Sequence, residues 1–136
     1  MLKLHRRTVL ALMAGAAAIA ATGAASALDV ITYSEQALAD AQASGKPYLL
    51  DFFATWCSTC AAQERVLEEL SGDPDYGAIP VIRVDWDQHS RGPLVAAMAI
   101  PRRSTLVLMT GTRELGRVVA DTRPDKIAGL LDLARS

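Results

Sequence analysis

The most informative stretch of this 136-residue chain is LDFFATWCSTC, residues 50–60. Its first half belongs to an apolar run that begins at Tyr48 and carries one charged residue, Asp51. Such a run predicts a strand that is covered on both faces. Its second half ends in two cysteines three residues apart, and an amphipathic helical pattern follows over residues 61–70. We therefore expect Cys57 and Cys60 at the junction of a buried strand and a helix.

Strand and helix patterns alternate along the rest of the chain. Strands are expected over residues 29–33, 79–86, 105–109 and 115–120, and helices from a Ser34 cap to Gly45, over residues 91–100, and from Pro124 through Leu133. Residues 71–77 are a loop by composition. The resulting order, β-α-β-α-β-α-β-β-α, predicts an α/β fold with a central mixed sheet, helices on both faces and a closing antiparallel hairpin. We expect residues 28–136 to form one domain.

The spacing of the two cysteines favours redox chemistry. A sulfur at a helix N-terminus lies near unpaired backbone N–H groups and the positive end of the helix dipole, which lower the pKa of a thiol. Cys57 is therefore the candidate nucleophile, since the thiolate is the attacking species. Cys60 lies one turn further along the helix and can resolve a mixed disulfide.

Two other interpretations of the pair are weaker. A permanent structural disulfide between residues three apart closes a very small loop, so it removes little entropy from the unfolded chain. A zinc site needs about four ligands. The chain has no second cysteine pair, and His89 alone does not complete a set. We therefore expect no metal and no cofactor beyond the Cys57–Cys60 pair itself.

The segment around the cysteines resembles the active site of the thioredoxin family. The strand aspartate, the Trp56 that precedes the first cysteine, and the CxxC spacing all match, and the element order fits over the whole of residues 28–136. The resemblance implies a thioredoxin-like fold, with Cys57 as nucleophile and Cys60 as resolving thiol. It also implies that Asp51 lies buried beneath the pair and accepts a proton from Cys60.

Two of these matched residues have alternative interpretations. A carboxyl in an apolar strand has a raised pKa and exchanges protons near neutral pH. Asp51 could instead be a satisfied buried acid paired with Arg83 across the sheet. Trp56 is expected to cover one side of the site and shape the docking of a protein substrate. The alternative for Trp56 is a simple core aromatic.

The sequence departs from the family at the loop expected to face the cysteines, where the family carries a cis-proline. Pro101 is one candidate for that position. An ungapped match instead places Ser104 there, directly before the apolar strand, and we prefer it. A cis bond before a non-proline residue costs about 2.5–4 kcal/mol, so we expect the Arg103–Ser104 bond to be trans. The serine hydroxyl would then be available for hydrogen bonding.

Arginines precede this serine. Arg102 and Arg103 are expected near the mouth of the site, where they would lower the pKa of Cys57 or attract an acidic partner. The alternative is a solvated loop. The residues expected to contact substrate are Trp56, Arg103, Ser104 and Thr105.

The N-terminus has the three regions of a secretory signal peptide. Residues 1–7 are basic, residues 9–25 are apolar and uncharged, and Ala25-Ser26-Ala27 is a small-residue cleavage pattern. We expect cleavage after Ala27 and a periplasmic location, without stable membrane insertion afterwards; an uncleaved anchor is the alternative. The pair Arg6-Arg7 also resembles a twin-arginine export signal, and an ordinary basic region fits as well.

Charge excludes some partners. Residues 1–27 hold three of the 14 basic residues and none of the 15 acidic ones, so the remainder has a net charge of −4. Without a basic stripe, nucleic acid is not an expected partner. We expect a monomer that acts on protein thiols and disulfides and receives electrons from a membrane donor, because the periplasm is kept oxidising.

The leading hypothesis is an exported thiol–disulfide oxidoreductase, a reductase or isomerase rather than an oxidant. The dipeptide between the cysteines, Ser58-Thr59, points to neither extreme of reduction potential, so the direction of electron flow stays open. The alternative is a binding or chaperone module with a non-catalytic disulfide.

Overall fold

A computed structural model describes residues 28–136 and contains a five-stranded mixed sheet. The strand order is β1-β3-β2-β4-β5, with β1, β3 and β2 parallel to one another and β4 antiparallel to both β2 and β5. The strands are β1 (Val30–Thr32), β2 (Pro47–Phe53), β3 (Val81–Asp85), β4 (Thr105–Thr110) and β5 (Arg113–Val119). The predicted signal peptide, residues 1–27, lies outside the described residues.

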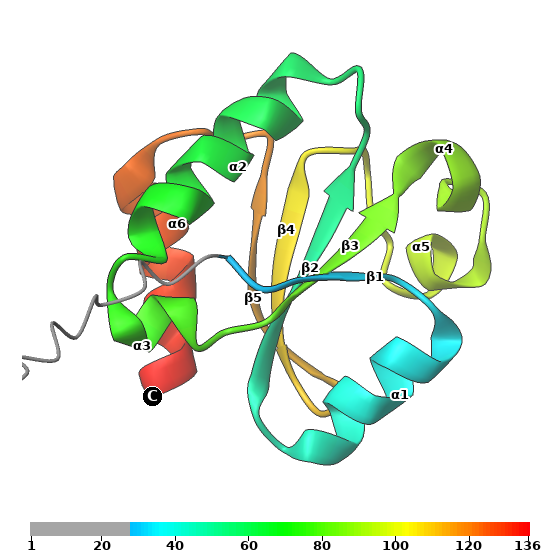
Figure 1. Cartoon of the computed structure of the whole chain (residues 1–136). Helices are drawn as coiled ribbons and strands as arrows, with labels where there is room; N and C mark the ends of the chain where they lie inside the picture. Colours follow the sequence, from blue (N-terminus) through cyan, green and yellow to red (C-terminus); the bar gives the residue numbers. More distant parts are fainter. Residues whose placement is uncertain (1–27) are drawn as a thin grey trace, which may run out of the picture.

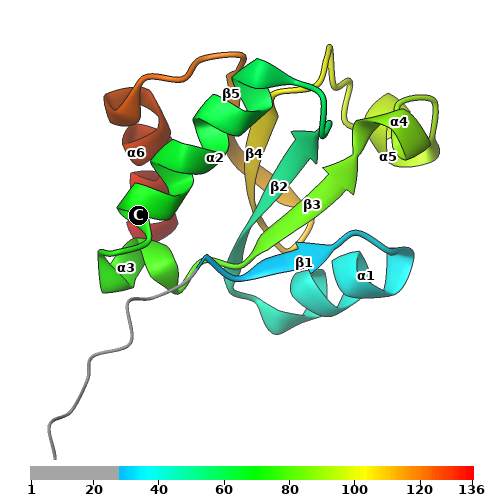
Figure 2. The same ribbon diagram turned by 45° about the horizontal axis from the view of Figure 1, so that its top comes forward.

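Helices cover both faces of the sheet (Figures 1 and 2). They are α1 (Glu35–Ser44), α2 (Ser58–Leu70), α3 (Pro74–Gly77), α4 (Trp86–His89), α5 (Pro93–Ala97) and α6 (Pro124–Asp132), followed by the 3₁₀ turn η1 (Leu133–Arg135). On one side α2 and α6 lie together, and on the other side lie α1, α4 and α5. The predicted α/β architecture, a mixed sheet between two helical layers with a closing hairpin, is confirmed.

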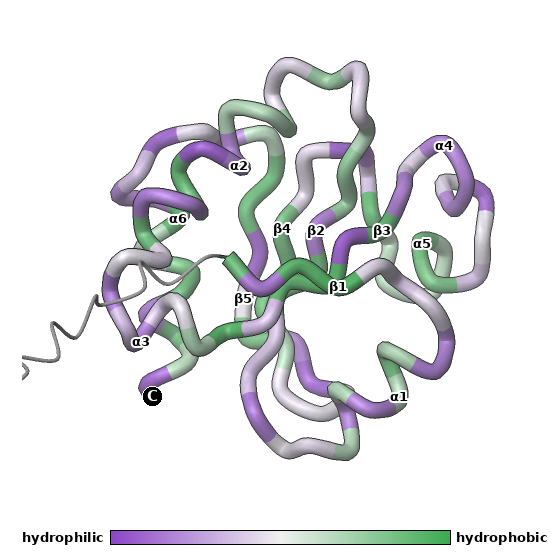
Figure 3. Tube along the Cα trace, viewed as in Figure 1, coloured by the Kyte–Doolittle hydropathy of each residue, from purple (hydrophilic) through white to green (hydrophobic). Residues whose placement is uncertain are grey.

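Alternation along β2 divides the core into two halves. Leu49 packs with residues of α2 and α6, whereas Leu50 and Phe52 pack with Val95 of α5 on the opposite face. Successive strand residues point to opposite faces, so Asp51 shares the α2 face with Leu49. Hydrophobic residues accordingly follow the strands, while α4 and the loop after it are mainly hydrophilic (Figure 3).

The first helix has the predicted ends. The Ser34 hydroxyl accepts a hydrogen bond from the Ala37 N–H at 3.0 Å, which satisfies one of the free donors of the first turn. Gly45 ends the helix with φ of 68°, a left-handed conformation in which a side chain would be strained.

Three segments differ from the sequence prediction. The expected loop contains the short helix α3, and the end of the expected strand at Trp86 opens α4 instead. Both helices are single turns whose preceding aspartate, Asp73 or Asp85, accepts a hydrogen bond from a backbone N–H two residues later. Aspartate favours turns and helix N-caps alike, so composition does not separate the two. The helix expected over residues 91–100 is reduced to α5, which Gly92 precedes as N-cap and Pro93 begins.

Candidate active site

Cys57 is the N-cap residue of α2. Its sulfur accepts a hydrogen bond from the backbone N–H of Cys60 at 3.1 Å, in the place where a serine or aspartate oxygen usually caps a helix. Both cysteines are free thiols and buried, with 4% and 1% of their surfaces exposed. The predicted position of the pair, between β2 and the helix that follows it, is confirmed.

The pKa values of the two thiols are shifted in opposite directions. Burial raises the pKa of Cys57, but hydrogen bonds from Cys60 and Ser104, with a smaller one from Arg103, outweigh burial and bring the pKa from 9.0 down to about 7. Burial raises the pKa of Cys60 as well, and its contact with Cys57 raises it further. Near neutral pH the negative charge therefore resides on Cys57, the better placed nucleophile.

Ser104, rather than Pro101, faces the cysteines. Its hydroxyl oxygen lies 3.1 Å from the Cys57 sulfur and 3.1 Å from the Cys60 sulfur, and the residue is fully buried. The peptide bonds of residues 28–136 include no cis bond, as predicted for Arg103–Ser104. Pro101 is exposed. The hydroxyl of Thr105 is bonded to the Arg102 carbonyl at 2.7 Å, within its own loop.

The backbone of Ser104 is held on both sides. Its N–H donates to the Phe52 carbonyl at 2.8 Å, and its carbonyl accepts from the Ala120 N–H at 2.8 Å. The φ angle of 62° lies in the left-handed region, which costs a residue other than glycine about 1 kcal/mol or more. Strain of this size persists only where the surrounding contacts determine the conformation.

Asp51 combines the two predicted properties. It is 2% exposed, and its carboxylate pairs with Arg83, its register partner on β3, at 3.3 Å. Burial raises the pKa of Asp51 from 3.8 to about 6, although Arg83 acts in the opposite direction. The Nη2 atom of the same arginine, Arg83, lies 2.9 Å from a carboxylate oxygen of Glu64 on α2. The acid is therefore satisfied by a partner and still able to exchange a proton near neutral pH.

Trp56 and Arg103 form the rim beside the nucleophile. Trp56 is 58% exposed, so the core-aromatic interpretation is wrong. Its indole N–H donates to the Asp87 carboxylate at 2.9 Å, and the Arg103 guanidinium lies 4.4 Å from the centre of its ring. A cation over an aromatic face is attracted by the ring quadrupole. The rim thus offers an apolar ring and a cation next to Cys57.

Sequence reasoning missed Gln63. This residue of α2 is 1% exposed, and its amide donates to the carbonyls of Ser104 at 3.0 Å and Asp121 at 3.1 Å. It therefore ties the helix that carries the cysteines to the two loops beside it. The available signal was spacing: Gln63 follows Cys60 by three residues and precedes Leu67 by four, so all three share one helix face.

Within residues 28–136, no group of three or more histidine, cysteine, aspartate or glutamate side chains is arranged to hold a metal ion.

Comparison with known proteins gives one consistent result. The thioredoxin family model matches residues 29–132. The thioredoxin of Staphylococcus haemolyticus is 35% identical over 85 residues, covering 62% of this chain and 78% of that protein. The thioredoxin of Staphylococcus aureus strain Mu50 is 31% identical over 94 residues, covering 68% and 86% respectively.

Solved structures agree with this result. The crystal structure of Trxlp from Edwardsiella tarda superposes with a TM-score of 0.69 at 33% identity, covering 76% of this chain and 98% of that one. A mutant thioredoxin from Halobacterium salinarum gives a TM-score of 0.65 at 24% identity, with coverage of 85% and 96%, which supports the fold alone.

Proposed function

The chain belongs to the thioredoxin family of protein-disulfide oxidoreductases, and from this we propose that Cys57 and Cys60 reduce or isomerise disulfides of protein substrates outside the cytoplasm. The observation that carries the proposal is the asymmetry of the pair. Cys57 caps α2 with a pKa lowered to about 7, while the pKa of its neighbour Cys60 is raised. Such a pair attacks first with one sulfur and resolves with the other.

The reaction proceeds in two exchanges. The Cys57 thiolate attacks one sulfur of the substrate disulfide, which breaks the substrate S–S bond, forms a mixed disulfide and releases the first substrate thiolate. Cys60 then loses its proton and attacks the Cys57 sulfur, which releases the second substrate thiolate and leaves a Cys57–Cys60 disulfide. Two electrons pass from the cysteine pair to the substrate, and the released thiolates take up protons.

Asp51 is the proposed acceptor of the Cys60 proton. Its carboxyl lies on the α2 face of β2, and its pKa of about 6 makes it a base near neutral pH. Arg83 pairs with this carboxylate, and Glu64 of α2 in turn pairs with Arg83. Around this centre, Trp56 and Arg103 are the proposed contacts for substrate. Thr105 supports the loop that carries Arg103 and Ser104, because its hydroxyl donates to the Arg102 carbonyl.

Action outside the cytoplasm rests on the signal-peptide pattern of residues 1–27 and the proposed cleavage after Ala27. In the described part of the chain, no helix has the length and apolar character needed to cross a membrane. We expect a monomer that is re-reduced by a membrane donor, since an oxidising compartment supplies no reductant of its own. We favour reduction of substrate disulfides over oxidation of substrate thiols because the Trp56-Cys57-x-x-Cys60 segment resembles that of reducing members of the family.

Insulin reduction in the presence of dithiothreitol tests the activity. The wild-type protein should accelerate precipitation of the insulin B chain, and Cys57→Ser should return the rate to background. Cys60→Ala, with Cys57 intact, should trap mixed disulfides from a periplasmic extract, and the double variant Cys57→Ala/Cys60→Ala should trap none. A wild-type protein that is inactive, with no trapped partner, would favour the binding-module alternative.

Two further measurements test the remaining parts of the proposal. A reduction potential of about −270 mV for the Cys57–Cys60 pair would support a reductase. A value of about −120 mV would overturn the preference for a reductase over an oxidant. Expression of the full chain in a bacterium with a periplasm should give a periplasmic product that begins at Leu28. Arg6→Lys/Arg7→Lys blocks export only if the twin-arginine route is used. A cytoplasmic product that retains residues 1–27 would contradict export.

A further inference from the structure

The hydroxyl of Ser104 is the polar group that touches both reacting sulfurs. Its oxygen is 3.1 Å from the sulfur of Cys57 and 3.1 Å from that of Cys60, with no exposure to solvent. A serine hydroxyl carries a single proton and donates one hydrogen bond at a time, while its oxygen still accepts. Ser104 can therefore serve either sulfur as donor, but only one of them at any moment.

The loop that carries Ser104 holds this hydroxyl in place with a strained backbone conformation. The left-handed φ of 62° would suit glycine better, yet glycine has no hydroxyl. Proline could not adopt that φ, and it lacks the N–H that Ser104 donates to the Phe52 carbonyl. The Gln63 amide adds a third contact, to the Ser104 carbonyl. A fixed backbone leaves rotation about the Cβ–Oγ bond as the motion that redirects the proton.

The negative charge moves between the two sulfurs during the reaction. In the reduced protein it resides on Cys57, where hydrogen bonds, including that from Ser104, lower the pKa to about 7. Cys60 then keeps its proton and donates it towards the serine oxygen. Once Cys57 is part of a mixed disulfide its sulfur is neutral and a weak acceptor, and the next charge to be stabilised forms on Cys60.

We propose that Ser104 is a catalytic residue that donates its hydrogen bond to the Cys57 thiolate before the first exchange and to the Cys60 thiolate before the second. The switch requires only rotation of the hydroxyl, because its oxygen is equally distant from both sulfurs. No proton is lost from the serine. The Cys60 proton leaves to a base, for which Asp51 is the proposed group, and the substrate disulfide is the only oxidant. This inference rests on the proposed function, since it assigns roles within those two exchanges.

A chromogenic disulfide separates the two steps. When reduced protein is mixed with excess 5,5′-dithiobis(2-nitrobenzoate), attack by Cys57 releases one thionitrobenzoate and resolution by Cys60 releases the second. Stopped-flow absorbance therefore reports both rates. At pH 7, Ser104→Ala should slow the first phase about fivefold, since a rise of about one unit from a pKa of about 7 lowers the thiolate fraction of Cys57 from about one half to about one tenth. It should slow the second phase about tenfold, because the pKa of Cys60 lies above that range. In a Cys60→Ala background, where only the first phase remains, the same substitution should slow that phase equally.

Thiol titration gives an independent measurement that needs no substrate protein. The pH midpoint of Cys57 alkylation by iodoacetamide should rise by about one pH unit in Ser104→Ala, because a charge-assisted hydrogen bond to the thiolate is lost. The other groups that act on this sulfur, Cys60 and Arg103, are unchanged in the variant. Ser104→Gly should behave as Ser104→Ala does, since it lacks the hydroxyl but relieves the strained φ. Tyr48→Phe, which removes a buried hydroxyl bonded to Gly111 at the other end of β2, is the matched control for loss of a buried hydrogen bond.

Each outcome bears on the inference. Unchanged phases and midpoint in both Ser104 variants would overturn it. An effect in Ser104→Ala that is absent from Ser104→Gly would also overturn it, because strain and not the hydroxyl would be the cause. A slower first phase with an unchanged second phase would overturn the switch and leave a fixed donor to Cys57. The proposed function fails separately, if the wild-type protein does not reduce insulin.

Discussion

Arg103 gives the entrance of the site a positive charge next to an aromatic surface. Its guanidinium lies over the ring of Trp56, the residue before the nucleophile, and it contributes to the lowered pKa of Cys57. Within the described residues, the ion pairs include no carboxylate partner for Arg102 or Arg103, whereas Arg117 and other arginines have one. A carboxylate of the substrate would therefore find a cation available beside the reacting sulfur.

Substitution of Arg103 should change substrate preference. We expect Arg103→Gln to lower kcat/KM for a disulfide peptide flanked by glutamate about two- to fivefold more than for the same peptide flanked by glutamine. This range corresponds to one solvent-exposed ion pair. Arg103 also affects the pKa of Cys57, but this effect is the same for both peptides and cancels in the ratio of their kcat/KM values. The difference between the two losses of kcat/KM should shrink as the salt concentration is raised.

Arg113→Gln is the matched control. Arg113 is exposed and opens β5 opposite Thr110, at the hairpin end of the β4–β5 pair and away from the end that carries Ser104. Equal losses for both peptides in Arg103→Gln would assign the residue a structural role and remove it from substrate recognition.

Single residues of the site differ in how well the sequence predicts them. The cysteines and Asp51 stand in one linear motif, so their spacing sufficed to bring them together. Ser104 lies 44 and 47 positions from the two sulfurs that it contacts, and the ungapped match to the family segment predicted its place. Gln63 and Asp87 act through contacts with residues that are 31 to 58 positions away along the chain. Helix spacing places Gln63 on the face of Cys60, but the partner that each side chain reaches depends on how helices and loops pack, and a single sequence carries no local signal for that partner.

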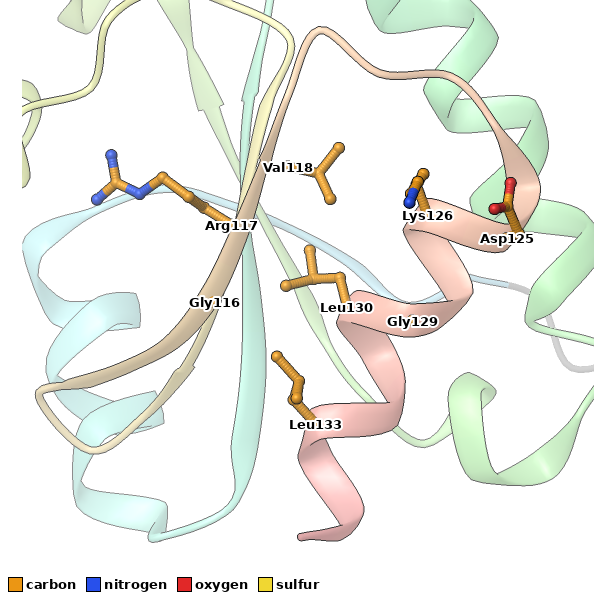
Figure 4. Close-up of a pocket in the computed structure, with 8 residues that line it drawn as sticks. All are labelled: Gly116, Arg117, Val118, Asp125, Lys126, Gly129, Leu130 and Leu133. Atoms are coloured by element: carbon orange, nitrogen blue, oxygen red, sulfur yellow. The ribbon is translucent and has the colours of Figure 1, made fainter.

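Contact between the last helix and the edge of the sheet depends on a glycine. Gly116 lies on β5 beside an irregularity in the β4–β5 register. Together with Leu130 and Leu133 it lines an open surface pocket of about 380 Å³ (Figure 4). A Cβ atom at Gly116 would lie 2.7 Å from a methyl group of Leu133 and 3.2 Å from one of Leu130. At Gly129, on α6, a Cβ atom would meet nothing within 4 Å.

The two glycines should therefore respond oppositely to alanine. Gly116→Ala should lower the free energy of unfolding by about 1 kcal/mol, because Leu130 is buried and must move. Gly129→Ala should raise it by about 0.5–1 kcal/mol, because alanine favours a helix and the position is open. Urea unfolding of both variants against wild type gives the two values. Stabilisation by both substitutions would show that α6 shifts freely on the sheet.

Element boundaries were predictable where local chemistry fixes them. Ser34, Gly45 and Pro124 begin or end helices as expected, because caps and glycine act through their immediate neighbours. The single-turn helices α3 and α4 were missed for the same reason, since Asp-rich turns and Asp-capped first turns have the same composition.

The whole molecule buries an acid at the centre of its sheet, and this lowers its stability at high pH. Asp51 lies on β2 between β3 and β4, with strands on both sides and α2 above. Burial raises the pKa of Asp51 most, Arg83 lowers it, and Glu64 adds a smaller rise, so the pKa in the folded protein is about 6. An acid whose pKa is higher in the folded state than in the unfolded chain favours folding when protonated. That contribution is complete below about pH 4 and is lost as pH rises through 6.

Asp51→Asn removes this ionisation while keeping the shape of the side chain. Its free energy of unfolding, measured with urea on reduced protein, should nearly match that of wild type at pH 4 and exceed it by at most about 3 kcal/mol at pH 8, the equivalent of a pKa shift from 3.8 to about 6. Cys57 and Cys60 titrate in both proteins, so their effects cancel in the difference. Asp40→Asn, on the exposed surface of α1, is the control for the same chemical change. A difference that is constant from pH 4 to pH 8 would mean that Asp51 ionises in the folded protein as it does in the unfolded chain. Asp51 would then be no better a proton acceptor for Cys60 than any surface aspartate.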